Sequence, residues 1–360
     1  MLMLPDEVAI PFIAIRAAIR RFIHGPADER WSWQLEITIA VAREFLRRNT
    51  IRANELAEKE PEAWLARLQR MRDLSDRTGM GMHCPALIEE FSIDDVPVMR
   101  FTPLNVNPQH EMLWVHGGGF HVGSVSSYRG MISHIAQRSG CRILAVDYRL
   151  APEHIFPAAI EDSTKAWHWL LENSSHPEKL FVGGDSAGAN IALSMTMQLR
   201  DSGITLPKAC MLLSPWTDLL LAGPSFRRNS RIDYLGGGLD IADLLASTYA
   251  GDVPLTDPRV SPFHGDLSGL PPMLIQVGTN DMLLDDARAF TSKAKAYGVE
   301  IELQEWDAQV HVWHQLYPVN PVSLDAMDAM GEYMDQQAEP MWVGHAAIRS
   351  RGRSAAEAGS

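Results

Sequence analysis

The sequence has few cysteines, and they are not arranged for disulfides or for metal binding. The 360 residues include three, Cys84, Cys141 and Cys210. Their number is odd, and their spacings match neither a CxxC pair nor a zinc site. We therefore expect no disulfide framework, buried structural thiols at Cys141 and Cys210, and a reducing compartment, the cytoplasm.

Long hydrophobic runs are also lacking. A membrane span needs about 18 consecutive apolar residues. The apolar stretch 8–23 contains Pro11 and is interrupted by Arg16, Arg20 and Arg21. It has neither the basic region nor the cleavage site of a signal peptide. We expect no stable membrane insertion and a helix that covers part of the protein's own surface. Contact with a membrane surface, as an amphipathic helix, is the alternative.

Positive charge is in the minority. The chain has 32 Lys and Arg against 45 Asp and Glu, so its formal net charge is −13. An acidic protein is a poor electrostatic partner for phosphate backbones, so we expect no nucleic-acid partner. Hydrophobic residues make up 46% of the chain and charged residues 21%, which favours a globular protein. The length predicts about two domains, or one large α/β domain with an elaboration.

Residues 1–77 are predicted to be helical and to form a segment of their own. Apolar residues recur there at helical spacing, and Pro26 ends the first stretch. From Ala86 the period changes to two, which predicts a β-hairpin. The predicted helices are Asp6–Ile23, Trp31–Arg48 and Ala53–Asp73, and the predicted hairpin strands are Ala86–Phe91 and Val96–Phe101.

Residues 78–335 alternate short apolar strands with helical stretches. This order predicts a doubly wound α/β fold, with a mostly parallel sheet covered by helices on both faces. An insertion around 216–256 interrupts the alternation, and residues 336–360 form a tail that we expect to be loose beyond Ile348. The predicted strands are Met112–Val115, Ile143–Asp147, Lys179–Gly183, Ala209–Leu213, Met273–Val277 and Glu300–Trp306.

A candidate nucleophile lies in the sequence Gly184-Asp185-Ser186-Ala187-Gly188. The five residues follow a predicted strand and precede a predicted helix, as a nucleophile elbow requires. In such a sharp turn Ser186 projects from the top of the sheet, and small neighbours allow strand and helix to approach closely. We expect Asp185 to hydrogen-bond nearby loops and hold the elbow. A chance match in a surface loop is the alternative.

A second signal is the glycine triplet in His116-Gly117-Gly118-Gly119-Phe120, directly after a predicted strand. Without side chains in the way, its backbone N–H groups can point into a cavity and stabilise a developing oxyanion. We assign this role to the N–H groups of Gly117, Gly118 and Ala187. His116 is expected to brace the loop. A phosphate-binding loop is disfavoured because no Lys follows the glycines.

Several separated motifs, in this order, resemble one family. They are His116–Phe120, Asp147–His154, Gly184–Gly188 and Asp257–Pro262, within residues 86–334. The sequence resembles the hormone-sensitive-lipase-like branch of the α/β-hydrolases, the bacterial family IV esterases. The resemblance implies an α/β-hydrolase fold and a serine hydrolase that cleaves carboxylic esters. It also implies a helical cap, built from the N-terminal helices and the insertion.

A serine nucleophile needs a base and an orienting carboxylate, in the chain order Ser, Asp or Glu, His. Asp281 stands in the loop just past a predicted strand, whereas favourable contact with a helix dipole, or N-capping, explains Asp285 and Asp286. The order leaves four histidines, and the resemblance implies His311 as the base. We expect His314 on the adjoining helix or near the rim. The four histidines are His264, His311, His314 and His345. The predicted catalytic residues are Ser186, Asp281 and His311.

Substrate identity is less constrained. Phe120, Trp216 and Asp218 are expected to line the pocket, and no metal or organic cofactor is needed. The resemblance implies short- to medium-chain acyl esters and a homodimer. The alternatives are a lactone hydrolase or small-molecule deacetylase, a peptidase and, from a different class, a non-catalytic small-molecule receptor on the same fold. Four bulky cap residues are expected to serve helix packing, with a narrower acyl pocket as the alternative: Phe12, Phe22, Trp31 and Trp33.

Overall fold

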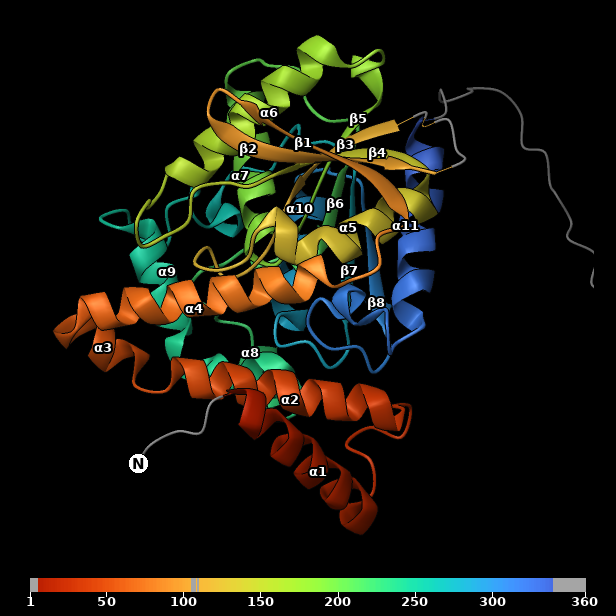
Figure 1. The fold of residues 1–360 in the computed structure, drawn as a ribbon. Coiled ribbons are helices and arrows are strands. Elements are labelled where there is room, and N and C mark those ends of the chain that lie inside the picture. The colour runs from red at the N-terminus through yellow and green to blue at the C-terminus, as the bar shows by residue number, and fades with distance from the viewer. Residues whose placement is uncertain (1–5, 105–107, 109, 339–360) are drawn as a thin grey trace, which may run out of the picture.

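A computed structural model describes residues 6–104, 108 and 110–338. Its centre is an eight-stranded sheet with the strand order β1-β2-β4-β3-β5-β6-β7-β8 (Figure 1). The pairs β1–β2 and β2–β4 are antiparallel, and all other pairs are parallel. The strands are β1 (Ala86–Ile93), β2 (Val96–Pro103), β3 (His110–Val115), β4 (Cys141–Val146), β5 (Leu180–Asp185), β6 (Cys210–Leu213), β7 (Met273–Gly278) and β8 (Ile301–Trp306).

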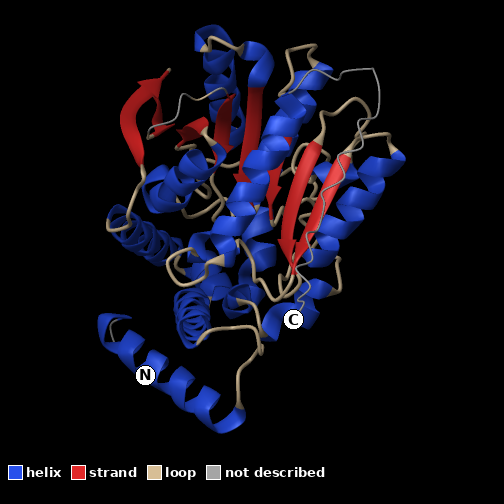
Figure 2. Ribbon diagram, turned by 90° about the vertical axis from the view of Figure 1, so that its right-hand side faces the viewer, coloured by secondary structure: helices blue, strands red, loops and turns tan. Residues whose placement is uncertain are grey.

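Helices cover both faces of the sheet (Figure 2). On one face α5 (Val125–Ser139) and α11 (Val322–Ala338) share an apolar cluster with the sheet. On the other face α6 (Ala158–Asn173), α7 (Ala187–Asp201) and α10 (Leu284–Ala296) do so. The inner strands β5, β6 and β7 are buried along their whole length, which explains their continuous apolar sequences. The predicted fold class is confirmed.

The parallel strands place the chemically important loops at one edge of the sheet. The glycine triplet follows β3, Ser186 follows β5, Asp281 follows β7 and His311 follows β8. Because the carboxyl ends of parallel strands meet at the same edge, four segments far apart in the sequence converge there.

The cap lies against this edge (Figure 1). It consists of α1 (Asp6–His24), α2 (Trp33–Thr50), α3 (Ala53–Lys59) and α4 (Pro61–Met80), together with the insertion 216–256. The insertion contains α8 (Ser225–Arg228), 3-10 turns at Asn229–Arg231 and Tyr234–Ile241, and α9 (Ala242–Ala250).

Three predicted boundaries are wrong. The boundary expected between residues 77 and 78 lies inside α4, which runs to Met80. The single helix expected over 53–73 is two helices, because Pro61 disfavours helical backbone at Glu60, whose φ is −140° and ψ 60°. The tail expected from residue 336 begins inside α11, which runs to Ala338. The loose end predicted beyond Ile348 lies outside the described residues.

Helix α1 packs on α2, and its Ala9 is buried, whereas several of its large apolar side chains are exposed. Phe12 is 64% exposed and Phe22 is 83% exposed. Trp31 is buried and donates its indole N–H to the carbonyl oxygen of Ala308 at 2.7 Å. The helix thus covers part of the protein's surface, as expected, and adds an exposed apolar stripe. No helix in the described part of the chain is long and apolar enough to cross a membrane.

Candidate active site

Ser186 stands in a strained turn between β5 and α7. Its φ is 53° and its ψ is −119°. This backbone conformation is unfavourable in free energy for any residue other than glycine. Its main-chain N–H donates to the carbonyl oxygen of Leu213 at 2.9 Å, which ties the turn to β6. A Cβ at Gly188 would lie 2.2 Å from the carbonyl oxygen of Val115, so only glycine fits there. The expected elbow is therefore present.

Asp281 and His311 come from neighbouring loops and form a buried pair. His311 Nδ1 lies 3.1 Å from Asp281 Oδ1, so the Nδ1 proton is donated to the carboxylate and Nε2 is left as the acceptor. The same Asp281 oxygen accepts the main-chain N–H of Leu283 at 2.8 Å. His311 is 3% exposed and Asp281 is fully buried, so little water competes for these bonds.

Electrostatics favour the protonated form of His311. Burial alone would lower the pKa of its imidazole, but the negative charges of Asp281, Asp233 and Asp185 and the hydrogen bond to Asp281 raise the pKa overall. A positive charge that forms on this ring is therefore stabilised by its surroundings.

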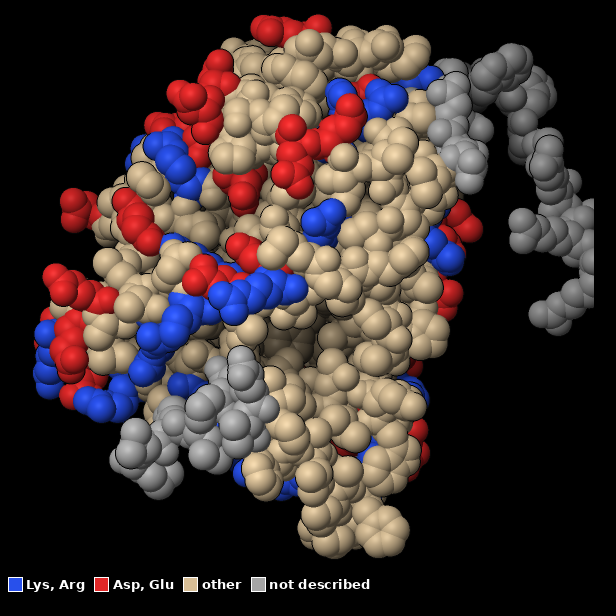
Figure 3. All heavy atoms as spheres, in the orientation of Figure 1, with Lys and Arg blue, Asp and Glu red and all other residues tan. Residues whose placement is uncertain are grey.

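Ser186 and His311 line one cavity of about 260 Å³ beneath the cap. Although both residues lie in the described part of the chain, no hydrogen bond joins them. Catalytic hydrogen bonds often tighten only when substrate is bound. The surface is hollowed between α4 and the lower cap helices (Figure 3). The residues that line the cavity come from the loops at the sheet edge and α5 (Gly118, Gly119, His121, Val122, Tyr128, Asp185, Ser186, Met282, Leu283, His311, Val312, Gln315), from α2 and α4 (Leu46, Thr50, Trp64, Leu68, Met71), and from the insertion (Trp216, Leu221, Phe226, Tyr234, Leu235, Gly238, Leu239, Ile241, Ala242, Leu245).

The glycine triplet requires a correction. The N–H of Gly117 does not face the cavity but donates to Asp185 Oδ1 at 3.1 Å, so it is not a free oxyanion donor. Gly118 and Gly119 line the cavity, and their N–H groups have no acceptor among the described residues. Ala187, the first residue of α7, has one of the N–H groups that a helix cannot pair internally. The available donors are those of Gly118, Gly119 and Ala187.

Asp185 and His116 support the glycine loop as expected. Asp185 is fully buried, burial raises its pKa to about 7, and its bond to Gly117 ties the loop to the elbow. His116 Nδ1 lies 2.8 Å from the carbonyl oxygen of Gly117, and its ring stacks on Tyr148 at 4.3 Å. A buried acid beside the nucleophile needs hydrogen-bond donors. That requirement could have indicated from the sequence that the N–H of Gly117 donates to Asp185.

The prediction that three residues line the pocket is wrong for two of them. Trp216 lines the cavity. Phe120 does not, because its ring stacks on Tyr249 with centroids 3.8 Å apart and is 1% exposed. Asp218 does not either, because Oδ1 lies 3.0 Å from His264 Nε2 and also accepts the Leu220 N–H.

None of the four bulky cap residues, Phe12, Phe22, Trp31 and Trp33, lines the cavity. Their expected role in helix packing is confirmed for Trp31, which is buried, and is wrong for the other three, which are exposed. The sequence interpretation missed the α4 residues that do line it, such as Trp64 and Leu68. Their helical spacing predicted only a packed face. Across residues 6–104 and 110–338, no three His, Cys, Asp or Glu side chains are grouped so that they could hold a metal ion.

Comparison with known proteins gives the family. The pattern of a family described by the alpha/beta hydrolase fold matches residues 112–315, more than half of the chain. The chain belongs to the α/β-hydrolase family.

Relatives of this α/β-hydrolase are named as an acetyl-hydrolase and as esterases. It is 40% identical over 225 residues to an acetyl-hydrolase of Streptomyces hygroscopicus, a match that covers 62% of this chain and 74% of that protein. It is 32% identical over 244 residues to the carboxylesterase NlhH of Mycobacterium tuberculosis, covering 65% and 76% of the two chains. A solved esterase from the bacterial hormone-sensitive lipase family shares 32% identity with a TM-score of 0.70, over 94% of this chain and all of that one.

The α/β-hydrolase therefore belongs to the hormone-sensitive-lipase-like, bacterial family IV branch, and it is a carboxylesterase. The expected family and enzyme class are confirmed, and the receptor alternative is set aside.

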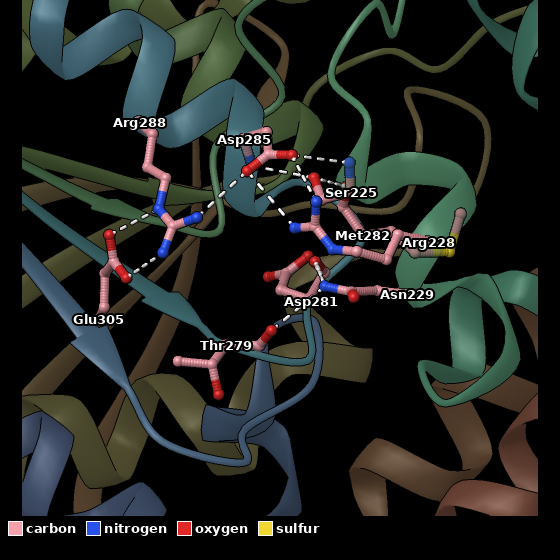
Figure 4. Close-up of polar contacts among 9 residues, drawn as sticks. All are labelled: Ser225, Arg228, Asn229, Thr279, Asp281, Met282, Asp285, Arg288 and Glu305. Atoms are coloured by element: carbon pink, nitrogen blue, oxygen red, sulfur yellow. Dashed lines mark hydrogen bonds and ion pairs between the residues drawn. The ribbon is translucent and has the colours of Figure 1, made fainter.

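In this α/β-hydrolase the other two candidates for the orienting acid, Asp285 and Asp286, form hydrogen bonds to other groups. Asp286 accepts the N–H and hydroxyl of Thr217, at 2.7 and 2.8 Å. Asp285 accepts the Ser225 N–H and pairs with Arg228 (Figure 4). These bonds, rather than a helix dipole alone, explain both carboxylates.

The competing histidines are committed as well. His314 was expected on the adjoining helix or near the rim of the site. It lies in a short 3-10 helix and is fully buried, so it is not at the rim. Its Nε2 lies 2.9 Å from Gln276 Oε1, and burial lowers its pKa to about 3. His264 pairs with Asp218. The fourth histidine, His345, lies outside the described residues.

Proposed function

We propose that this carboxylesterase uses Ser186 as nucleophile, His311 as base and Asp281 as orienting acid, on esters with short to medium acyl chains. The observation that carries the proposal is that the hydrogen-bonded pair His311–Asp281 opens onto the same cavity as Ser186.

The first half of the reaction forms an acyl-enzyme. Nε2 of His311 takes the proton of Ser186 Oγ as that oxygen attacks the ester carbonyl carbon. The carbonyl oxygen becomes an oxyanion and accepts hydrogen bonds from the N–H groups of Gly118, Gly119 and Ala187. Each such donor is worth about 2.7–4 kcal/mol in comparable sites. When the tetrahedral intermediate collapses, the alkoxide leaves with the proton from His311.

The second half restores the enzyme. Water gives a proton to Nε2 of His311 and attacks the acyl carbon, and the carboxylic acid leaves as Ser186 recovers its proton. The charge of Asp281, one hydrogen bond away, stabilises the imidazolium at both stages.

The cavity supports small apolar substrates. A volume of about 260 Å³ is below the range of about 300–1,000 Å³ for drug-sized ligands, and the cap walls it with apolar side chains. Related proteins are named acetyl-hydrolase and ethyl acetate hydrolase, which favours a short acyl group. Deacetylation of a small molecule is the second candidate, and the acetyl-hydrolase relative favours it.

Ser186→Ala tests the proposal, with Ser194→Ala as a matched control. Ser194 lies eight positions further along, in α7; it is buried, and its hydroxyl has no hydrogen-bond partner among the described residues. Hydrolysis of p-nitrophenyl esters from acetyl to palmitoyl is measured together with fluorophosphonate labelling. We expect Ser186→Ala to lose turnover and labelling while remaining folded, and Ser194→Ala to keep both. Substantial turnover by Ser186→Ala would refute the assignment.

A further inference from the structure

Asp233, in the insertion, is buried between the two loops that carry the proposed base and acid. Its Oδ2 accepts the main-chain N–H of Met282 at 2.9 Å and that of His311 at 3.1 Å. Met282 directly follows Asp281. Among the described residues of the insertion, Asp233 alone has a side chain hydrogen-bonded to both loops.

Other residues of the insertion hold the same loop (Figure 4). Asn229 Nδ2 donates to the carbonyl oxygens of Thr279 and Asp281, at 3.2 and 2.7 Å. Ser225 Oγ donates to the carbonyl oxygen of Met282 at 2.8 Å. The main chain on both sides of Asp281 is thus fixed by the cap rather than by the sheet alone.

Asp233 is itself anchored to the N-terminal part of the cap. Arg43 in α2 donates from Nη1 to its carbonyl oxygen at 3.0 Å. Its Oδ1 accepts the main-chain N–H of Leu235 at 3.0 Å, which starts the 3-10 turn Tyr234–Ile241. A chain of hydrogen bonds therefore leads from α2, through Asp233, to the main chain of His311.

The charge of Asp233 also reaches the imidazole. Burial and the neighbouring Asp281 raise the pKa of Asp233 to about 7, and its charge contributes to the raised pKa of His311. The other titratable or charged groups near this pair are Tyr234 in the insertion and Arg43 in α2, which interact with Asp233, and Asp185 at the end of β5, which acts on His311.

We propose that Asp233 is a positioning residue for ester hydrolysis, which fixes the loops of Asp281 and His311 relative to each other and makes their alignment depend on the docked cap. The inference rests on the proposed function. A misplacement of about 1 Å in such a pair costs about 100-fold in rate, so two main-chain hydrogen bonds at this point have a large effect on turnover.

Asp233→Asn tests the proposal. Asparagine keeps the volume but has one oxygen, so it cannot accept from Leu235 on one side and from Met282 and His311 on the other. We expect kcat for p-nitrophenyl butyrate to fall about 10- to 100-fold, with KM within about threefold. Loss of the negative charge lowers the pKa of His311, and neutral His311 is the active form. The acidic limb of kcat/KM therefore moves to lower pH.

Asp286→Asn is the matched control. Asp286 is also buried, burial raises its pKa to about 7 as well, and its partners are Thr217 and Asp218. It has no bond to the loop of His311, so we expect kcat within about threefold of wild type and an unmoved acidic limb. Wild-type kcat and pH profile in Asp233→Asn, or the same two changes in Asp286→Asn, would overturn the proposal.

Asn229→Ala decides the positioning role without a change of charge, also in the event that Asp233→Asn does not fold. We expect kcat to fall about three- to tenfold with the acidic limb unmoved, because only the grip on the loop is lost. An unchanged kcat would contradict the proposal. Retained turnover in Ser186→Ala would instead refute the proposed function, so the two failures are distinguishable.

Discussion

The loops at the sheet edge and the cap above them build one cavity in different ways. The loops contribute unusual backbone: Ser186 has φ 53°, Gly118 φ 110° and Val312 φ 40°. The cap contributes mostly apolar side chains on regular helices, such as Leu46, Trp64 and Leu68. From this difference we expect that reactivity depends on the loops at the sheet edge, whereas selectivity depends on the apolar side chains of the cap. Asp233 links the two, since a cap carboxylate holds the main chain of the loops.

The largest effect is expected from two histidines of the sheet edge that differ only in their surroundings. His311→Gln removes the proposed base and should lower kcat by a factor of about 10⁴ or more. His314→Gln leaves the pair intact, because His314 contacts Gln276 rather than the cavity, and should keep kcat within about tenfold. Initial rates with p-nitrophenyl butyrate, with circular dichroism as the folding check, give the comparison. Equal losses in both variants would contradict the assignment of the base.

The next largest difference in kcat is expected between substitutions of two glycines of the triplet. A Cβ at Gly118 would lie 1.9 Å from the carbonyl oxygen of Val122, whereas one at Gly119 would lie 3.0 Å from the movable side chain of Leu245. Gly118→Ala must shift the loop and one oxyanion donor, so we expect kcat to fall about 100- to 1,000-fold. Gly119→Ala should lose about tenfold, since its φ of 60° costs alanine about 1–2 kcal/mol.

The outcome is read from kcat and from the inactivation rate with a fluorophosphonate, which needs the same donors. If Gly119→Ala loses more than Gly118→Ala while both remain folded, the sheet edge is less rigid than its backbone indicates.

The acid side of the pH profile should depend on the carboxylates around His311, Asp233 of the insertion included, and not on the apolar side chains of the cap. In the proposed mechanism the active form has neutral His311, whose pKa is raised above its usual 6.5 by the surrounding carboxylates. We expect kcat/KM to fall about tenfold per pH unit on an acidic limb centred above pH 6.5. Measurement from pH 5 to 9, with an ester that has no ionisable group in this range and with the rate of its non-enzymatic hydrolysis subtracted at each pH, checks this. A limb below pH 6 would show that the carboxylates do not act on the imidazole as described.

The same division explains what could be predicted from the sequence. Ser186, Asp281 and His311 could be expected near one another because each lies in the loop that follows a strand, and parallel strands bring their carboxyl ends together. The family resemblance, and not the strand pattern, distinguished His311 from the other histidines. Gly117 was assigned wrongly because a triplet of glycines does not reveal which N–H turns outward. That choice depends on Asp185, whose side chain accepts the Gly117 N–H from the other side.

The cap was harder to predict for a physical reason. Its helices could be located from their periodicity, but periodicity does not say which protein surface an apolar face meets. Phe12 and Phe22 face outward, while Trp64 and Leu68 face the cavity, and both sets have helical spacing. Asp233 could not be recognised from the sequence, because it is an isolated acid in the irregular insertion and gains its partners only when the cap docks.

The smallest effect, and the one that belongs to the cap, is expected at Met71. Its side chain lines the cavity from α4, whereas Leu74 on the same helix is 38% exposed and does not. Met71→Ala enlarges the cavity by a few methylene groups, each worth about 0.8 kcal/mol of apolar contact, or roughly fourfold in kcat/KM. We expect the ratio of kcat/KM for p-nitrophenyl hexanoate over acetate to rise about three- to tenfold in Met71→Ala and to stay constant in Leu74→Ala. Because neither change touches the sheet edge, the acidic limb should be the same in both. A shifted limb in Met71→Ala would show that the apolar side chains of the cap act on the pKa of His311 as well as on substrate selectivity, and the distinction drawn between these side chains and the sheet edge would then fail.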